Sequence, residues 1–258
     1  MMSGGSVRRK YHLYELFSLA ACCLCFFGCG LEEYYVVEAP FIIQQEPKYD
    51  SEFTLRYFDF KTNETENPNR GSFVFLGTDV YYKIYNRYDS ITSVTSALSS
   101  ANNSTDPSSA ANLLKKNYKY KQLGSEAGST PLIRAAGADR RIYIRLTNYQ
   151  TDRRYQAKII VGYAGDSSIA PTNVPKRAGN RYSFDFGRDG DNDSASKTLS
   201  STDTDYNYSS SGFSSGYDNT YFVDMYAVSV GLDENYTEQY SKVLHLGTVA
   251  INASSKDN

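Results

Sequence analysis

The sequence has no tryptophan, and beyond residue 29 it has no cysteine. Its four cysteines lie close together at the amino-terminal end, at Cys22, Cys23, Cys25 and Cys29. A disulfide framework or a thiolate zinc site in the rest of the chain is therefore excluded. Histidine is almost as scarce, with only His12 and His245. No histidine cluster, phosphate-cradling glycine loop or heptad run is present, so the zinc, nucleotide-binding and coiled-coil classes have no support.

An excess of basic charge is missing as well, because 27 Lys and Arg stand against 29 Asp and Glu. Without residues 1–28 the balance is 24 against 28, a formal net charge of −4. Proteins that bind nucleic acid present a basic face, so we expect no nucleic-acid partner.

Tyrosine is abundant, with 24 Tyr beside 13 Phe. Most tyrosines fall in alternating runs, which favours packing on a sheet with the hydroxyls at the wet edge. A tyrosine-rich binding face is the alternative.

Residues 1–28 have the pattern of an export signal. Arg8, Arg9 and Lys10 precede a mostly apolar run over residues 13–27, and polar residues follow soon after it. A membrane-spanning helix needs about 20 apolar residues, whereas this run is shorter and contains Glu15. We therefore predict a lipoprotein signal peptide that is cleaved.

The cleavage is expected before Cys29. Gly28 supplies the small residue that a lipoprotein signal peptidase accepts, and Cys29 ends the apolar run. Cys22 is the alternative, because residues 19–22, LAAC, match the usual bacterial lipobox. Cleavage at Cys22 would leave an apolar leader with two free thiols outside the membrane, where they would oxidise or mispair. Cys29 is therefore the predicted lipidation site.

Acyl chains such as palmitate contribute about 0.8 kcal/mol per buried methylene, and more than one chain anchors a protein stably. A lipidated Cys29 would make the membrane a partner of this protein. We expect a cell-envelope protein, with the outer membrane or cell surface favoured over the inner membrane of a bacterium.

The remaining chain is expected to form a tether over residues 29–40, one β-rich domain over 41–252 and a tail over 253–258. Alternating apolar and polar residues predict strands at 41–44, 53–58, 72–88, 118–122, 131–135, 140–148, 155–163, 181–187, 221–231 and 242–252. Segments 140–148 and 155–163 should form one hairpin, and the last two segments another. Gly77 is expected to mark a bulge.

Two stretches interrupt this pattern. Residues 89–116 predict a small helical insertion, because Ile91, Val94 and Leu98 recur at helical spacing. The insertion is either a lid or recognition element, or structural decoration. Residues 188–219 are almost wholly Ser, Asp, Asn, Gly and Thr, too polar to bury, and predict a long flexible loop.

Three segments resemble spirochaetal, particularly treponemal, lipoproteins of unknown function. They are CGLEEYYVVEAP at 29–40, YYKIY at 81–85 and YAVSVGLDENYTEQYSKVLHLGTVAI at 226–251, which together cover less than a third of the chain after the signal. The resemblance implies a mainly β, antiparallel sandwich of the immunoglobulin or fibronectin-III type. None of the three segments carries a catalytic residue of that family.

One nucleophile pattern is present, GFSSG at 212–216, and Ser214, Asp224 and His245 follow in the chain order of α/β hydrolases. That motif needs a strand, a tight turn and a helix to expose the serine, and no helical pattern follows Ser214. We therefore predict no catalytic residue here. His245 is expected to be a half-buried structural residue of a strand.

A calcium pattern is incomplete. Asp189, Asp191 and Asp193 have the spacing of an EF-hand loop, but Ser194 stands in place of the glycine and Ser200 in place of the bidentate glutamate. A looser calcium site at a loop tip is the alternative to a solvated loop, and we predict no metal and no cofactor.

The leading hypothesis is a non-enzymatic, membrane-anchored binding module with a protein or glycan ligand. A carboxylate-dependent hydrolase or carbohydrate-active sandwich is the second hypothesis, and it requires two carboxylates about 5 to 10 Å apart in a cleft. A structural envelope protein is the third, and it would show neither a cleft nor an exposed apolar patch.

Overall fold

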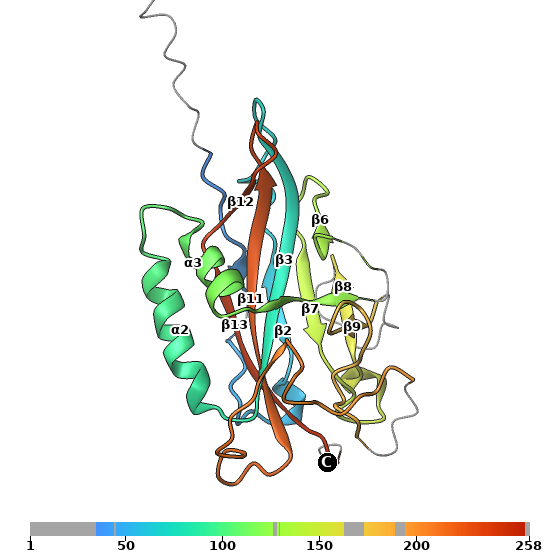
Figure 1. Cartoon of the computed structure of the whole chain (residues 1–258). Coiled ribbons are helices and arrows are strands. Elements are labelled where there is room, and N and C mark those ends of the chain that lie inside the picture. Colours follow the sequence, from blue (N-terminus) through green and yellow to red (C-terminus); the bar gives the residue numbers. More distant parts are fainter. Residues whose placement is uncertain are drawn as a thin grey trace, which may run out of the picture. The chain divides into compact units, whose positions relative to one another are not determined.

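The computed structural model describes residues 35–43, 45–125, 128, 130–162, 173–188 and 194–255 (Figure 1). Residues 36–258 form one compact unit, to which all of these except Tyr35 belong. This unit is mainly β, and its strands pair antiparallel except for one pair. The prediction of a mainly β, antiparallel architecture is confirmed.

The small sheet has four strands. Their order is β1 (Phe41–Ile42), β2 (Phe58–Lys61), β7 (Arg141–Arg145) and β8 (Lys158–Val161). The adjacent strands β7 and β8 pair antiparallel, as expected for a hairpin of these segments.

The large sheet is built on two long strands, β3 (Val74–Tyr85) and β11 (Thr220–Leu232). β12 (Glu238–Tyr240) and β13 (Leu244–Asn252) pair with the far edge of β11. Three short strands follow one another along the free edge of β3: β6 (Ile133–Arg134), β4 (Lys121–Gln122) and β10 (Tyr206–Asn207), of which β10 is parallel to β3. β5 (Gly124–Ser125) and β9 (Pro175–Lys176) form a separate two-stranded sheet. The register between β3 and β11 shifts beside Gly77, so the expected bulge is present.

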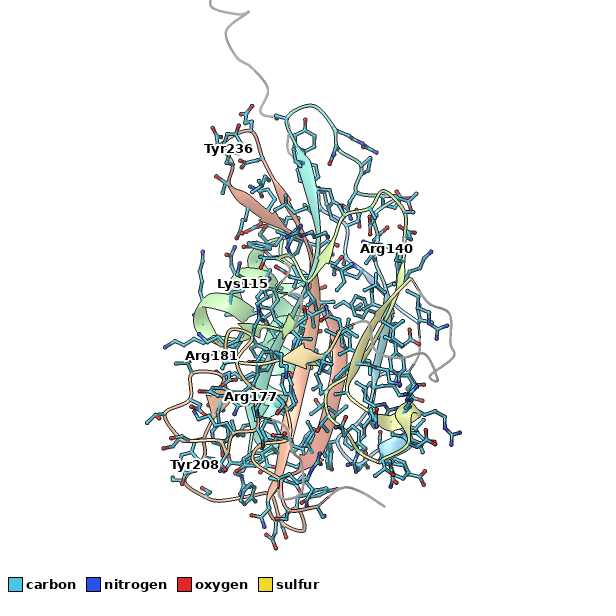
Figure 2. The ribbon with its side chains drawn as sticks, turned by 90° about the vertical axis from the view of Figure 1, so that its right-hand side faces the viewer. Lys115, Arg140, Arg177, Arg181, Tyr208 and Tyr236 are labelled. Atoms are coloured by element: carbon cyan, nitrogen blue, oxygen red, sulfur yellow. The ribbon has the colours of Figure 1, made fainter. Side chains whose placement is uncertain are left out.

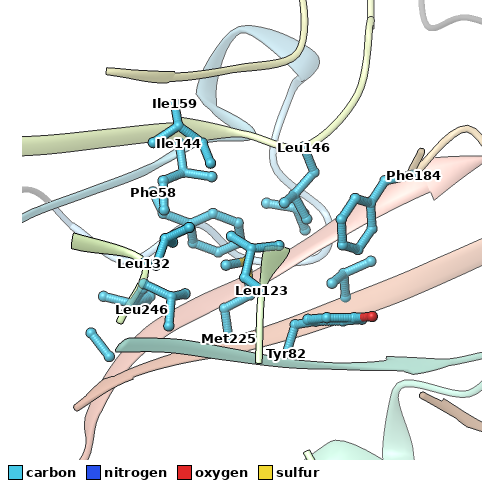
Figure 3. Close-up of a cluster of buried hydrophobic side chains, with 14 of the residues drawn as sticks. Phe58, Tyr82, Leu123, Leu132, Ile144, Leu146, Ile159, Phe184, Met225 and Leu246 are labelled. Carbon is cyan, nitrogen blue, oxygen red and sulfur yellow. The ribbon is translucent and has the colours of Figure 1, made fainter. Parts of the chain in front are cut away.

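Strand alternation divides the apolar side chains of β3 between two cores. Val80, Tyr82 and Ile84 pack with side chains of the small sheet in the first core, and Met225 of β11 joins them. Figure 3 labels Tyr82 and Met225 in this core. Because neighbouring residues point to opposite faces, Tyr81 packs in the second core, on the other face of the large sheet. Both faces of the large sheet are therefore buried.

Helices cover the second face. α2 (Asp89–Ala101), α3 (Ser109–Asn112) and the π-helical turn η2 (Leu113–Asn117) occupy the segment expected to be helical. Ile91, Val94 and Leu98 are buried against this face, as their spacing predicted. Figure 1 shows α2 and α3 on one side of β3 and β11, with β7 and β8 on the other.

Several strand predictions are wrong. Phe53–Leu55 is the 3-10 turn η1, which is closed by a hydrogen bond from the Arg56 amide to the Phe53 carbonyl oxygen. The Arg145 guanidinium stabilises this turn by binding the carbonyl oxygens of Phe53 and Thr54 at 2.7 and 3.1 Å. Residues 181–187 form only an isolated bridge, between Tyr182 and Arg177, and the chain then turns, with Phe186 at φ of +57° outside the extended region. Segments 118–122 and 131–135 shrink to the two-residue strands β4 and β6. A second 3-10 turn, η3 (Arg153–Tyr155), lies between β7 and β8.

The ordered domain begins before the expected position 41. Val37 is buried, and Asn67 bonds both to the Glu38 amide at 2.8 Å and to the Glu38 carbonyl oxygen at 2.9 Å. The part of the expected tether that the structure describes therefore belongs to the domain from Val37 onward.

The polar segment over 194–219 has buried members. Asp205 is 1 % exposed and binds the buried Arg177 guanidinium at 3.3 Å, and Ser214 is 9 % exposed. The expectation that this segment is too polar to bury is wrong at these positions, because hydrogen bonds and an ion pair satisfy the polar groups. Its flexibility stays a prediction.

Candidate functional site

A bulge in β13 creates the platform for the site. Met225 lies opposite Gly247 and Tyr226 lies opposite His245, so Leu246 is an extra residue in β13. Gly247 takes φ of +107°, and a Cβ atom there would lie 2.5 Å from the Pro47 carbonyl oxygen. The absence of a side chain therefore lets the chain at Pro47 cross β13 closely.

The crossing chain is residues 45–50, called here the crossing segment. The Thr248 amide donates a hydrogen bond to the Pro47 carbonyl oxygen at 3.0 Å. The Glu46 carboxylate reaches the His245 ring, with Glu46 Oε2 2.8 Å from Nδ1. Backbone and side-chain contacts thus hold the crossing segment against the bulge.

His245 is held between two carboxylates. Its Nε2 lies 2.9 Å from Asp224 Oδ1, opposite the contact of its Nδ1 with Glu46. The His245 side chain is 24 % exposed, in agreement with the expected half-buried position. Burial lowers the pKa of His245, but the charges and hydrogen bonds of Asp224 and Glu46 outweigh burial and raise that pKa to about 10. His245 is therefore an imidazolium at neutral pH.

Asp224 is completely buried and accepts three hydrogen bonds. Besides His245, the Thr248 hydroxyl donates to its Oδ1 at 2.7 Å and the Tyr120 hydroxyl to its Oδ2 at 2.6 Å. The Tyr85 hydroxyl donates to the Tyr120 oxygen at 3.1 Å. A buried carboxylate is tolerated when it is paired and hydrogen-bonded, and Asp224 meets both conditions.

A groove of about 740 Å³ opens above this network. The crossing segment forms one wall, and Ile42, Tyr88, His245 and Thr248 complete the lining. The Tyr49 and Tyr88 rings lie with their centroids 3.7 Å apart at 35°. We call this hollow the His245 groove.

Asp50 adds a carboxylate to the lining of the His245 groove beside aromatic rings, and Lys48 adds an ammonium group. Burial, Tyr49, Asp224 and Asp50 raise the pKa of Tyr88. Tyr217 packs edge-on against Tyr49 at 5.6 Å, and burial, Tyr49 and Asp50 raise its pKa against the opposing effect of Arg56. The groove thus offers aromatic surfaces next to a carboxylate, which suits a ligand with both apolar faces and hydrogen-bond donors.

The structure brings two of the three residues of the hydrolase pattern together and leaves the third apart. Asp224 and His245 form an ion pair, whereas the Ser214 hydroxyl accepts a hydrogen bond from the Tyr88 amide at 3.0 Å. Both ring nitrogens of His245 are occupied by carboxylates. A general base needs a ring nitrogen that can take the serine proton, and His245 has none to offer.

A second groove, of about 500 Å³, lies between α3, η2 and β12. Lys115 lies there over the Tyr240 ring, 3.9 Å from its centroid, and 3.5 Å from Glu238. Asp106 also lines it. Lys116 lines the groove as well. Of the two carboxylates in the lining, Glu238 is paired with Lys115 (labelled in Figure 2), and Asp106 forms no ion pair among the described residues.

The other predicted site residues lie outside the described residues. They are the candidate lipidation sites Cys29 and Cys22 and the calcium pattern 189–193. Among the residues that the structure does describe, no three His, Cys, Asp or Glu side chains are placed to hold a metal ion. The same part of the chain contains no helix that is long and apolar enough to cross a membrane.

Sequence reasoning missed Glu46 and Tyr120, because no motif or spacing links them to their partners. Glu46 lies 199 residues from its partner His245, and Tyr120 lies 104 residues from Asp224. No family model, curated protein or solved structure matches this chain.

Proposed function

We propose that the protein is a membrane-anchored, non-enzymatic binding module of a bacterial cell envelope, and that the His245 groove is its ligand site. The observation that carries this proposal is the state of His245. It stands at the base of the groove as a cation whose two ring nitrogens both contact carboxylates. Such a residue fixes the shape and charge of the groove but offers no base for catalysis.

The hydrolase alternative draws less support from the same geometry. Glu46 and Asp50 both line the His245 groove, but Glu46 is the partner of His245. In the second groove, Glu238 is the partner of Lys115. A glycosidase needs one carboxyl group that keeps its proton and another that is free to attack or to activate water. In each groove one of the two carboxylates is already paired with a cation.

A purely structural envelope protein is also less favoured, because the groove has an aromatic lining and is flanked by exposed apolar residues. Phe41, Ile42 and Ile43 are 44, 39 and 41 % exposed in succession. A cleft beside exposed apolar side chains is typical of an interaction surface. The ligand class that fits is a glycan or a polar protein segment with an aliphatic or sugar-ring face.

The anchor and the finer fold type belong to the same proposal. A lipid on Cys29 would place the domain at the outer membrane or cell surface. Two mainly antiparallel sheets that share one core support the immunoglobulin or fibronectin-III type implied by the resemblance to treponemal lipoproteins. The helical layer over the large sheet would be an addition to that type.

The test is a binding screen with matched variants. Purified protein is applied to glycan and protein panels, and each ligand found is measured again with Asp50→Asn and Tyr49→Ala. Tyr208→Ala is the control, because Tyr208 is 53 % exposed and does not line the groove. Circular dichroism of each variant checks that the fold is kept.

We expect the two groove variants to weaken binding at least tenfold and the control to leave it within twofold. Equal binding by all variants would exclude the His245 groove as the ligand site. Turnover of ester or glycoside substrates that Glu46→Gln or Ser214→Ala abolishes, with the fold intact, would show that the protein is an enzyme.

A further inference from the structure

β12 turns one backbone edge away from its partner β11. At the start of this pair, the Asp233 amide donates a hydrogen bond to the Thr237 carbonyl oxygen at 3.1 Å. Hydrogen-bonded and non-hydrogen-bonded pairs alternate along an antiparallel ladder. The backbone groups of Gln239 therefore face β11, while those of Glu238 and Tyr240 point to the opposite side. We call this side the outer edge of β12.

The outer edge is covered at Tyr240 by a side chain from the helical insertion. The Ser108 hydroxyl accepts a hydrogen bond from the Tyr240 amide and donates one to the Tyr240 carbonyl oxygen, both at 3.2 Å. Further along the chain, the Asn102 side chain makes the same two contacts with the backbone of Val243, at 2.9 Å each. These two side chains take the place of a neighbouring strand.

The outer edge is open at Glu238. Among the described residues, neither the backbone N–H nor the carbonyl oxygen of Glu238 is hydrogen-bonded. Ser108 lies both at the outer edge and in the lining of the second groove, of about 500 Å³, and Glu238 lines this groove too. Figure 1 shows β12 beside α3, which forms part of the opposite wall. The free backbone donor and acceptor of Glu238 therefore belong to the second groove.

The groove also contains a cation that the protein leaves unpaired. Lys116 is exposed and forms no ion pair among the described residues, whereas Lys115 is paired with the Glu238 carboxylate at 3.5 Å. The Asp106 carboxylate accepts a hydrogen bond from the Ser108 amide at 2.9 Å, so one of its oxygens is already engaged. An acidic side chain in a ligand would find its counter-ion in Lys116.

We propose that the second groove binds an extended peptide with an acidic side chain, which adds to the large sheet as a short strand at the outer edge of β12. A residue of an extended chain presents its N–H and C=O on the same side, as Glu238 does, so the two backbones can exchange both bonds. Strand addition of this kind takes affinity from main-chain bonds and specificity from side chains. The acidic side chain would pair with Lys116. The site does not depend on the His245 groove or on its ligand.

A second copy of this chain is a less favourable occupant of the edge. Two copies of β12 that pair antiparallel about a two-fold axis would place the two Glu238 residues opposite each other. Side chains of opposite residues lie on the same face, where like charges are destabilising. A peptide without a glutamate at that position avoids this repulsion.

The test uses the purified full chain in neutral detergent micelles and a library of heptapeptides with blocked ends. Asp is fixed at the centre of each peptide and the other positions are varied. Each peptide that binds is made again with Asn or Lys at the centre, and again with each backbone amide N-methylated in turn. N-methylation removes a main-chain donor, so it should abolish binding at the position that pairs with Glu238.

Hydrogen exchange of single amides, followed by NMR, shows where the peptide binds. In the free protein the Glu238 amide should exchange fast and the Tyr240 amide slowly, because only the second is hydrogen-bonded. Saturation with peptide should slow exchange of the Glu238 amide at least tenfold and leave that of Tyr240 little changed.

Two charge reversals test the acidic side chain. Lys116→Glu alters the groove, and Lys242→Glu makes the same change at an exposed lysine outside its lining. We expect Lys116→Glu to weaken binding of the Asp peptide about fivefold or more, as for a surface ion pair whose sign is reversed. It should leave the Asn peptide within twofold, and Lys242→Glu should leave both within twofold.

Each outcome decides for or against the site. Binding that slows exchange at Glu238, is lost on N-methylation and depends on Lys116 supports strand addition. The proposal is wrong if no library peptide binds, if bound peptides leave Glu238 exchange unchanged, or if the two lysine variants weaken binding equally. Slow Glu238 exchange in the free protein that becomes fast on dilution would also overturn it, because a second copy would then cover the edge. None of these results bears on the His245 groove, whose lining residues are different.

Discussion

Raising the pH should remove the proton that holds the crossing segment to β13. His245 has a pKa of about 10 in the folded protein, against about 6.5 for an unperturbed histidine in the unfolded chain. A raised pKa means that the folded state binds the proton more tightly than the unfolded state does. The stabilisation is therefore complete below pH 6.5 and is lost as the pH rises towards 10.

The magnitude follows from the two pKa values. Each pKa unit corresponds to about 1.4 kcal/mol, so the difference between about 10 and 6.5 amounts to about 5 kcal/mol at most. Between pH 7 and 9 the folded protein keeps the proton and the unfolded chain does not. The free energy of unfolding should then fall by about 1.4 kcal/mol per pH unit, or about 3 kcal/mol over this range.

Urea unfolding at pH 7, 8 and 9 measures this slope. Far-ultraviolet circular dichroism is the signal, because the chain has no tryptophan for fluorescence. His245→Gln is the matched variant, since the amide does not titrate while Tyr120 and Thr248 can still donate to Asp224. The variant should be less stable at pH 7, and the difference from the unaltered protein should shrink as the pH rises.

The difference in the free energy of unfolding between the two proteins cancels the contributions of groups that titrate in both. One of these groups is Lys83, whose pKa is lowered. A constant difference between pH 7 and 9 would refute the assignment of a protonated His245.

Three further predictions test the bulge, the serine and the anchor. Gly247→Ala should lower the free energy of unfolding by about 2–4 kcal/mol in thermal unfolding, because its φ is unfavourable for alanine and the added Cβ meets Pro47. Gly212→Ala, with nothing within 4 Å of its added Cβ, should lower it by only about 1–2 kcal/mol, and equal losses would contradict the close crossing at Pro47. Ser214→Ala should cost about 1–2 kcal/mol in urea unfolding, since it leaves the Tyr88 amide without its acceptor, and no loss would show that this bond is unimportant. Cys29→Ala should abolish palmitate labelling and release the protein from membranes, and labelling that persists would move the lipid to another residue.

The sequence predicts those strands and helices whose apolar residues recur at a regular spacing. Alternation in β3 places Val80, Tyr82 and Ile84 in one core and leaves the intervening residues for the other face. Helical spacing places Ile91, Val94 and Leu98 of α2 against the large sheet. These patterns are local, and each is decided by whether a side chain is apolar.

The alternation of apolar residues predicts a strand at one place where the chain instead forms a turn that a distant side chain stabilises. Residues 53–58 alternate as a strand would, but Phe53–Leu55 forms η1, and Arg145 stabilises this turn from about 90 positions away by binding the Phe53 and Thr54 carbonyl oxygens. Arg145 also lies near the faces of four tyrosine rings, Tyr57, Tyr143, Tyr149 and Tyr155. The tyrosines of this region therefore surround a buried cation in addition to packing a sheet.

The site at His245 could not be predicted from the chain order alone. The hydrolase pattern contains two residues that do form an ion pair, Asp224 and His245, but its third residue, Ser214, does not contact His245. The order of three residues along the chain does not determine which of their atoms come into contact. The ring nitrogen that a serine would need is bound instead by Glu46, from a segment that crosses only because Gly247 lacks a side chain.

Averaging over the whole chain also hides local charge. A charge balance over the whole chain is negative, yet residues 115–121 read KKNYKYK and contain four lysines. Periodicity could place this run near a helix end, but it could not show that Glu238 pairs with Lys115. A patch of like charge depends on which opposite charges lie within reach, and that depends on the fold. Net charge therefore excludes a basic face only when it is counted over a surface and not over a sequence.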